Sequence, residues 1–254
     1  MPDRPRLLIL GGTAEARMLA AVLAPRFTVT TSLAGRTITP RMPAGAVRVG
    51  GFGGVDGLTA YLTLERIAAV IDATHPFAAT ISAHAVVACT ATGVPRLVVQ
   101  RPPWQAGPGD RWLAVPSAAA AQTVMALSLP GDAGVLLTVG RGGLPAFAGC
   151  AGRRLVVRSV DDPGSLPFAA TVVRGRGPFA LADELALMTA ERIGLVVTRN
   201  SGGDEAKLIA ARQLGVPVVM IDRPPAPPGD TVADPAAALA WLERSFAVTA
   251  GGFY

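Results

Sequence analysis

The sequence predicts an α/β protein built from two doubly wound parallel-sheet (Rossmann-like) domains. Three observations support this fold class. Short aliphatic runs alternate with helical stretches along the whole chain, as in parallel sheets covered by helices on both faces. Half of the 254 residues are hydrophobic and only 16% are charged, so we expect a large core and no disorder. A segment rich in proline and glycine, residues 101–112, divides the pattern into two halves.

The first half, assigned residues 1–103, contains five predicted strands. They span residues 6–10, 27–32, 46–49, 68–73 and 95–100. Predicted helices over residues 14–24, 55–65 and 78–92 lie between them. Each strand is short and aliphatic, and each helix begins within a few residues of a strand end. This order is typical of a parallel sheet with helical crossovers.

The second half, assigned residues 104–254, repeats the pattern. Its strands are predicted over residues 134–139, 153–159, 170–175, 194–199 and 216–221, and its helices over 118–129, 180–192 and 204–214. A turn-rich break, residues 224–230, precedes a last helix over residues 235–246 that could pack on either domain. Ligands of such sheets bind outside the carboxyl ends of the strands. We therefore expect the active site in the cleft between the domains, formed by the loops that follow strands.

The basic charge balance is compatible with three kinds of partner: nucleic acid, an anionic membrane or an acidic small ligand. The net charge is +5, carried by 22 arginines and a single lysine, Lys207. A GC-rich genome would also produce this arginine bias, but arginine binds carboxylates and phosphates with a planar fork. No dense basic run is interleaved with aromatic residues, so nucleic acid is not an expected partner.

Cysteine usage and hydropathy point to a cytoplasmic protein. Cys89 and Cys150 are isolated in apolar surroundings, which predicts buried thiols and no metal motif. The apolar run near the amino end is too short for a signal peptide. Residues 113–131 are uncharged but contain prolines and several hydroxyl and amide side chains, so we read a helix of a soluble protein and no membrane span.

A strand, a Gly-Gly turn and a helix start follow one another in LLILGGTAEAR, residues 7–17. Gly11 and Gly12 let the backbone approach a phosphate, which the amino end of the helix would bind. Thr13 could cap this helix or donate to a ligand oxygen. The third glycine of the dinucleotide fingerprint is missing, so this loop alone is a weak signal.

The end of the second strand predicts which cofactor binds. NAD enzymes of this fold carry a carboxylate about 20 residues after the glycines, where it accepts from the ribose 2′-hydroxyl. Residues 27–39 contain no carboxylate and instead offer Ser32, Arg36 and Thr37. Hydroxyls and a guanidinium would bind a 2′-phosphate that a carboxylate would repel. The pattern favours NADPH, although a polar surface loop would look similar.

The fourth strand ends in VIDATHPFA, residues 70–78. Thr74 or His75 could cap the next helix, with Pro76 in its first turn. Thr74 is also a candidate cofactor contact. Histidine is also suited to acid–base roles, so His75 could instead line the nicotinamide pocket as an acid–base group. His84 lies within an apolar helix and is expected to be structural.

Cationic and hydroxyl side chains follow several strands of the second half. Serine and backbone N–H groups at a helix start, flanked by cations, form an anion site. We therefore expect this domain to bind a multiply anionic substrate, although any single arginine could be solvated surface. The candidate substrate-binding residues are Thr138, Arg141, Arg174, Arg176, Arg199, Asn200, Ser201 and Lys207.

In these segments the chain resembles the precorrin-6A reductases of cobalamin biosynthesis. The resemblance rests on LILGGTAEAR (8–17), TSLAGRT (31–37), DATHPFA (72–78), RGPF (176–179) and TRNSGGDEAKLIAARQLGVPVVMIDRP (198–224). These segments occur in both halves, and their combination is specific although no single one is. Where the family commonly has lysine in the last segment, this chain has Arg199, which keeps the charge but changes the donor geometry.

The resemblance implies that NADPH reduces one carbon–carbon double bond of precorrin-6A to give precorrin-6B, by direct hydride transfer and without flavin or metal. The implied substrate is an acidic tetrapyrrole fringed with acetate and propionate groups. Neighbouring enzymes of the cobalamin pathway are further candidate partners. For the proton, water is as plausible a source as His75.

Two other functions stay open at this point. One is a non-redox tetrapyrrole enzyme resembling uroporphyrinogen-III synthase. The other is an NADPH sensor without catalysis. A synthase has no use for a 2′-phosphate pocket, and a sensor has no use for the cations of the second domain.

Overall fold

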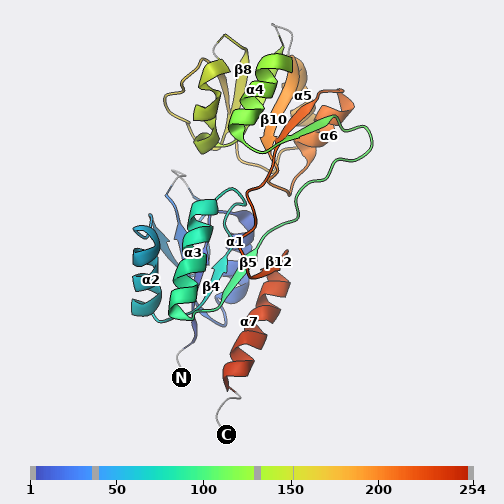
Figure 1. Ribbon diagram of the computed structural model, residues 1–254. Coiled ribbons are helices and arrows are strands. Elements are labelled where there is room, and N and C mark those ends of the chain that lie inside the picture. The colour runs from blue at the N-terminus through green and yellow to red at the C-terminus, as the bar shows by residue number, and fades with distance from the viewer. Residues whose placement is uncertain (1–3, 36–39, 129–132, 151, 251–254) are drawn as a thin grey trace. The chain divides into compact units, whose positions relative to one another are not determined.

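The computed structural model describes residues 4–35, 40–128, 133–150 and 152–250, and the chain divides into two compact units (Figure 1). The first unit comprises residues 1–102 and 224–254, and the second comprises residues 103–223. Each unit contains one six-stranded sheet in which every strand pair is parallel. The predicted fold class, two doubly wound α/β domains, is confirmed at this level.

The first sheet has the strand order β12-β5-β4-β1-β2-β3. Its strands are β1 (Arg6–Leu10), β2 (Thr28–Leu33), β3 (Ala46–Val49), β4 (Ile67–Asp72), β5 (Arg96–Val99) and β12 (Asp230–Val232). Its helices are α1 (Ala14–Leu23), α2 (Gly54–Leu64), α3 (Ala79–Thr92) and α7 (Pro235–Ala250). The order reverses between β1 and β4, so the loops after these two strands flank the switch point where such sheets bind ligands.

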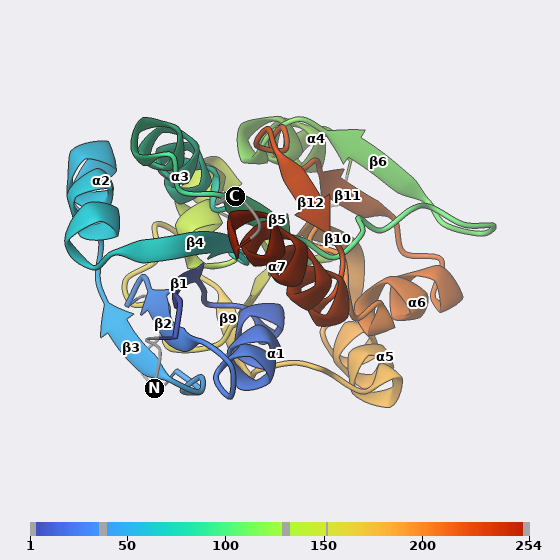
Figure 2. The same ribbon diagram turned by 90° about the horizontal axis from the view of Figure 1, so that it is seen from below.

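Both faces of this sheet are covered by helices (Figures 1 and 2). On β1, Leu7 and Ile9 pack in one core cluster with residues of α1 and α7. Leu8 and Leu10 pack in a second cluster with residues of α2 and α3. Successive side chains of a strand point to opposite faces, which is why a continuous aliphatic run predicted a strand buried on both sides.

The second sheet has the strand order β6-β11-β10-β7-β8-β9, with its switch point between β7 and β10. Its strands are β6 (Trp112–Val115), β7 (Gly134–Thr138), β8 (Leu155–Ser159), β9 (Thr171–Arg174), β10 (Ile193–Arg199) and β11 (Val218–Ile221). The helical elements are α4 (Ala118–Ser128), the 3-10 helix η1 (Arg141–Cys150), α5 (Leu181–Ala190) and α6 (Ala206–Gln213). Leu136 and Val196 of the central strands pack with Met188 of α5 and Leu208 of α6.

Two strands and the 3-10 helix η1 were not predicted. Strand β6 begins at Trp112, the last residue of the predicted connector, and continues through residues 113–115, which the sequence had grouped with an uncharged helical stretch; β12 begins in the turn-rich break. Both lie at sheet edges, where β6 pairs with β11 and β12 pairs with β5. Strand β12 has only three residues, two of them polar, so it shows no aliphatic run.

The last helix belongs to the first unit, a question that the sequence left open. The sequence had grouped residues 224–254 with the second half, whereas β12 and α7 lie in the first unit. Ala238, Trp241 and Leu242 of α7 are buried in the cluster that also holds α1. The indole Nε1 of Trp241 donates to Asp230 Oδ2 at 2.7 Å, which fixes the helix to the strand before it.

Candidate active site

The glycine loop after β1 is shaped by close packing on one side and open space on the other. Gly11 N–H donates to the carbonyl of Ser32 at 2.9 Å. A Cβ at Gly11 would lie 2.7 Å from Thr31 Cγ2, so no larger residue fits without a shift. Gly12 has φ +107°, and a Cβ there would meet nothing within 4 Å. The backbone at Gly12 is therefore open to approach by a ligand.

Thr13 ties the loops after β1 and β4 together. Its hydroxyl accepts from Ala16 N–H at 3.1 Å as the N-cap of α1 and donates to the carbonyl of Ala73 at 2.7 Å. The predicted capping role is confirmed, and the hydroxyl proton is donated to the Ala73 carbonyl. The first N–H groups of an α-helix have no acceptor inside the helix and lie at the positive end of its dipole.

Glu15, in the first turn of α1, places a negative charge beside this anion-binding helix end. Its Oε1 accepts from Arg101 Nη1 at 2.9 Å. The guanidinium offsets the carboxylate charge, which would otherwise oppose a phosphate. Arg101, at the start of the connector, was not among the predicted site residues.

The loop after β4 is organised by a buried carboxylate. Asp72 Oδ1 accepts from the backbone N–H of Thr74 at 3.2 Å and from its hydroxyl at 2.7 Å. The Thr74 hydroxyl also lies 3.3 Å from Ser82 Oγ of α3. Thr74 is buried, so its hydroxyl positions the loop. Asp72 Oδ2 lies 4.0 Å from Arg96 Nη1, and neither of these two buried atoms has a hydrogen-bond partner among the described residues.

His75 does not cap α3, and neither does Thr74. The helix begins at Ala79, and its N-cap, Ala78, has no side-chain hydrogen bond. Instead, His75 Nδ1 accepts from the backbone N–H of Phe77 at 3.2 Å. Because Nδ1 is an acceptor, the neutral imidazole carries its proton on Nε2. The expected capping role fails because α3 begins only at Ala79.

The ends of β2 and β3 bring a serine and an arginine together. Ser32 pairs with Arg48 in the parallel register, and Arg48 Nη1 donates to Ser32 Oγ at 2.7 Å. The other two residues predicted here, Arg36 and Thr37, lie outside the described residues. Arg48 was not predicted. The signal that could have found it is its position at the end of the strand that neighbours β2.

In the second unit, the loops after β7 and β10 meet at the switch point. The Thr138 hydroxyl donates to the carbonyl of Val197 at a long 3.4 Å. The guanidinium of Arg199 lies against Gly140, because a Cβ there would be only 2.4 Å from Arg199 Nη2. Gly140 also has φ +69°. Arg141 begins η1 and is exposed.

Asn200 and Lys207 both contact the connector tryptophan. The amide of Asn200 accepts from Trp104 N–H at 2.8 Å and donates to the Trp104 carbonyl at 3.1 Å. Trp104 Nε1 donates to the carbonyl of Gly203 at 3.0 Å, and Lys207 Nζ lies 4.1 Å from the Trp104 ring centroid. Arg223 Nε donates to the Asn200 carbonyl at 2.7 Å. The Asn200 side chain is thus used structurally. Arg199 and Lys207 keep this loop cationic.

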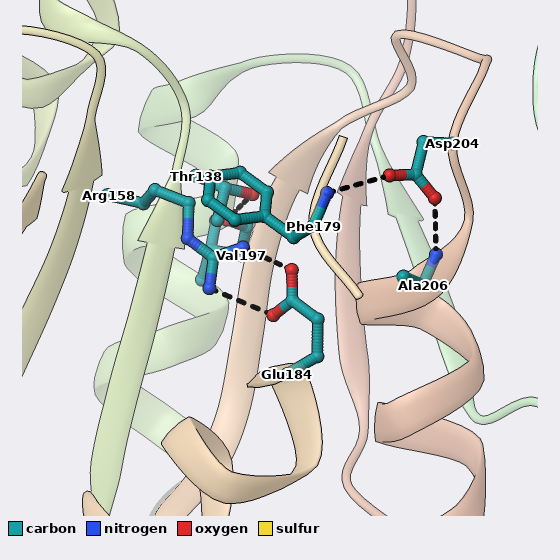
Figure 3. Close-up of polar contacts among 7 residues, drawn as sticks. All are labelled: Thr138, Arg158, Phe179, Glu184, Val197, Asp204 and Ala206. Carbon is teal, nitrogen blue, oxygen red and sulfur yellow. Dashed lines mark hydrogen bonds and ion pairs between the residues drawn. The ribbon is translucent and has the colours of Figure 1, made fainter. Parts of the chain in front are cut away.

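The loop after β9 is held by a buried ion pair (Figure 3). Arg158 and Glu184 form two hydrogen bonds, of which the Nη2–Oε2 contact is 2.9 Å. The Phe179 ring lies over the guanidinium of Arg158, whose Cζ is 4.3 Å from the ring centroid. Phe179 N–H donates to Asp204 Oδ2 at 3.2 Å, and Asp204 Oδ1 accepts from Ala206 N–H at 3.0 Å.

These contacts join the loop after β9 to the start of α6. Arg174 ends β9 and is exposed, and Arg176 follows it in the same loop, half-buried. The predicted cationic residues of the second unit thus lie at or after the carboxyl ends of β7, β9 and β10 in one parallel sheet, in which β8 separates β9 from β7. Neither Arg158 nor Glu184 was predicted to support the site.

Two further findings concern only the described part of the chain. There, no three or more histidine, cysteine, aspartate or glutamate side chains are grouped so that they could hold a metal ion. Nor does any helix within those ranges have the length and apolar character needed to cross a bilayer.

Comparisons with known proteins cover nearly the whole chain. The family model described as precorrin-6x reductase CbiJ/CobK matches residues 6–243. A precorrin-6A reductase from Rhodococcus erythropolis is 48% identical over 93% of this chain and 97% of its own length. A cobalt-precorrin-6A reductase from Methanothermobacter thermautotrophicus is 29% identical over 87% of this chain and 78% of its own. A solved structure titled CobK precorrin-6A reductase superimposes with a TM-score of 0.88 at 46% identity, covering 95% of this chain and 97% of that one.

Proposed function

The chain belongs to the precorrin-6x reductase (CbiJ/CobK) family of cobalamin biosynthesis, and from this premise we propose that it reduces one carbon–carbon double bond of precorrin-6A with NADPH, giving precorrin-6B. The observation that carries the cofactor part is the Gly11–Gly12–Thr13 loop at the switch point of the first sheet. The proposed nucleotide site comprises Gly11, Gly12, Thr13, Ser32, Arg36, Thr37 and Thr74.

The residues at this site fit a phosphorylated dinucleotide. Gly12 leaves open space beside the first N–H groups of α1, which suits a pyrophosphate. Between Glu15 and Asp56 the sequence contains no carboxylate, so nothing acidic stands where an NAD ribose would need an acceptor. Thr13 and Thr74 contribute by holding the two loops in place, since their hydroxyls are bonded to Ala73 and Asp72.

NADPH, when bound, supplies the hydride. The protein must position the acceptor carbon close to it and exclude water. The proton then comes from water or from His75, whose Nε2 carries the proton while Nδ1 is bonded to Phe77. The hydride and the proton together account for the two hydrogens added across the double bond, and neither flavin nor metal enters the proposed reaction.

The second unit is the proposed tetrapyrrole-binding unit. Arginines at strand ends would pair with the carboxylates that fringe the macrocycle, in the bidentate manner that guanidinium favours. We propose Thr138, Arg141, Arg174, Arg176, Arg199, Ser201 and Lys207 as direct contacts, with Asn200 in a supporting role. The higher identity to a relative named precorrin-6A reductase than to one named cobalt-precorrin-6A reductase supports a metal-free substrate.

The alternatives of a synthase-like enzyme and of a non-catalytic sensor lose their support. The family match spans residues 6–243, and the family is described as one of reductases. The remaining alternative within the family concerns cobalt in the substrate, and this is open to direct test.

The proposal is tested with purified protein, NADPH and enzymatically prepared precorrin-6A. NADPH absorbance should fall only when precorrin-6A is present, with one NADPH consumed per macrocycle. Cofactor with deuterium in place of both nicotinamide C4 hydrogens should deliver deuterium to the product carbon. Product that forms without deuterium would refute direct hydride transfer, and faster turnover of the cobalt form would refute the metal-free substrate.

A further inference from the structure

Arg48 is a half-buried cation fixed at the edge of the sheet where the proposed nucleotide site begins. It lies in β3, and its register partner in β2 is Ser32. In a parallel pair, register partners project from the same face of the sheet. The Ser32 carbonyl in turn accepts from Gly11 N–H at 2.9 Å. Arg48 therefore lies one strand beyond the glycine loop, at the carboxyl edge of the same sheet.

The guanidinium of Arg48 is held in one orientation by its hydrogen bonds and by an aromatic ring. Nη1 donates to Ser32 Oγ at 2.7 Å and to the Gly50 carbonyl at 3.0 Å, and Nη2 donates to the Gly51 carbonyl at 2.9 Å. The Phe52 ring stacks on the guanidinium, with Arg48 Cζ 3.7 Å from the ring centroid. An arginine fixed in this way has already lost its rotamer entropy before any ligand arrives.

Arg48 keeps binding capacity after these contacts. A guanidinium has five N–H groups, and three of them are used. Nε–H and the second N–H of Nη2 make no hydrogen bond to any other described residue, and no described carboxylate pairs with the charge. A residue needed only to hold the Gly50–Gly51 turn would not require an uncompensated charge.

The surroundings leave room for an anionic group. A Cβ built at Gly50, Gly51, Gly53 or Gly54 would meet nothing within 4 Å. The turn beside Arg48 is thus lined by glycines on an open side. No acidic residue occurs in the sequence from residue 16 to residue 55 to repel a phosphate.

We propose that Arg48, with Ser32, binds the 2′-phosphate of the cofactor and is the residue that selects NADPH over NADH. This inference rests on the proposed function, and it differs from the sequence expectation, which gave the role to Arg36. Charge-assisted hydrogen bonds from a preorganised guanidinium are worth enough to change affinity by about 10- to 100-fold.

The test measures binding of 2′,5′-ADP and 5′-AMP by calorimetry, since these probes differ only in the 2′-phosphate. The wild-type protein should prefer 2′,5′-ADP. Arg48→Gln should weaken 2′,5′-ADP by about 10- to 100-fold and leave 5′-AMP unchanged. Arg48→Lys keeps the charge but loses the planar fork, so its affinity for 2′,5′-ADP should lie between those of the wild type and Arg48→Gln. Arg6→Gln is the matched control, because Arg6 begins the central strand β1 at the amino-terminal end of the same sheet.

Each outcome has a defined meaning. Equal losses for both probes in Arg48→Gln would make Arg48 a purely structural residue and overturn the inference. An unchanged preference in Arg48→Gln, with the preference lost in Arg36→Gln, would return the role to Arg36 and also overturn it. A wild-type protein without any preference for 2′,5′-ADP would refute NADPH dependence itself, which is a failure of the proposed function and is seen before any variant is made.

Discussion

The side-chain amide of Asn200 bonds the backbone of Trp104 at both ends: its oxygen accepts from the backbone N–H at 2.8 Å, and its nitrogen donates to the backbone carbonyl at 3.1 Å. The two residues are 96 positions apart, and the contact fixes the connector to the loop after β10. The Trp104 indole is buried and carries Lys207 on its face. The connector at Trp104 is therefore a packed part of the second unit.

Asn200→Ala should destabilise the second unit by about 2 kcal/mol, because two hydrogen bonds are lost and a backbone N–H is left without its partner. Asn200→Asp should cost a similar amount, since a carboxylate cannot donate to the Trp104 carbonyl. Urea unfolding followed by tryptophan fluorescence measures the loss. Gln213→Ala, an exposed amide of the same unit, is the control and should be nearly neutral. A stable Asn200→Ala would mean that the connector is held by the Trp104 indole alone.

Thr13→Val should weaken both the fold and the cofactor. The valine keeps the shape but loses the N-cap bond to Ala16 and the bond to the Ala73 carbonyl, at a cost of about 1–2 kcal/mol. Since the two loops are no longer tied, the dissociation constant for NADPH should rise. Thr13→Ser retains the hydroxyl and should restore both properties. If Thr13→Val loses stability but binds NADPH normally, the loop tie is not part of the nucleotide site.

Glu184→Gln should be among the most damaging single substitutions in the second unit. Removing one partner of a buried, hydrogen-bonded ion pair typically costs about 3–5 kcal/mol because the other charge stays buried. The double variant Arg158→Met, Glu184→Leu should recover most of this stability. Circular dichroism melts of the three proteins provide the comparison, and a double variant no better than Glu184→Gln would contradict the ion-pair account.

The Arg158–Glu184 ion pair should also affect substrate binding through the loop after β9. Phe179 lies on Arg158, so the double variant should fold yet hold Arg174 and Arg176 less firmly. We expect a raised KM for precorrin-6A with an unchanged dissociation constant for NADPH. Equal effects on both ligands would show that the substitution disturbs more than this loop.

The fold was predictable because buried parallel strands leave a strong local signal. The aliphatic run of β1 and the Gly-Gly turn after it are visible in a few consecutive residues, and the structure places them at a switch point. Strand β12 was missed because its place in the sheet depends on pairing with β5, more than 120 positions away, and its three residues carry little hydrophobic signal. Pairing across such a distance is decided by tertiary packing, which a local pattern does not contain.

The sequence could predict which polar and cationic residues lie at strand ends, but not which partners their side chains bond. The sequence identified the hydroxyl at Ser32 and expected a guanidinium near it, but the described partner is Arg48, contributed by the neighbouring strand. Likewise, the sequence marked Asn200 as polar and close to an anion site, whereas its amide is bonded to Trp104. Whether a polar side chain is available to a ligand depends on partners that are distant in the chain.

Stability should depend on pH through Asp110. Hydrogen bonds from Arg212 hold the pKa of the Asp110 carboxyl below its ordinary value of 3.8. A carboxyl whose pKa is lowered on folding contributes stability that is fully present above the unfolded pKa and is lost as the pH falls through the folded pKa. Asp110→Asn should therefore be less stable than the wild type at pH 6, and the difference should shrink below about pH 4. Urea unfolding across this range tests it, and a constant difference would contradict the pairing.

Arg199→Gln with Lys207→Met should separate the two binding functions of the enzyme. Arg199 lies against Gly140 at the switch point of the second sheet, and Lys207 lies over Trp104 in the same unit. Removing both charges should raise the KM for precorrin-6A by about tenfold for each ~1.4 kcal/mol of lost interaction, with little change in NADPH affinity. Steady-state kinetics and NADPH calorimetry give the two quantities. Arg111→Gln, a charge removed elsewhere in the same unit, is the control. Loss of NADPH binding in the double variant would mean that the roles of the two units are reversed.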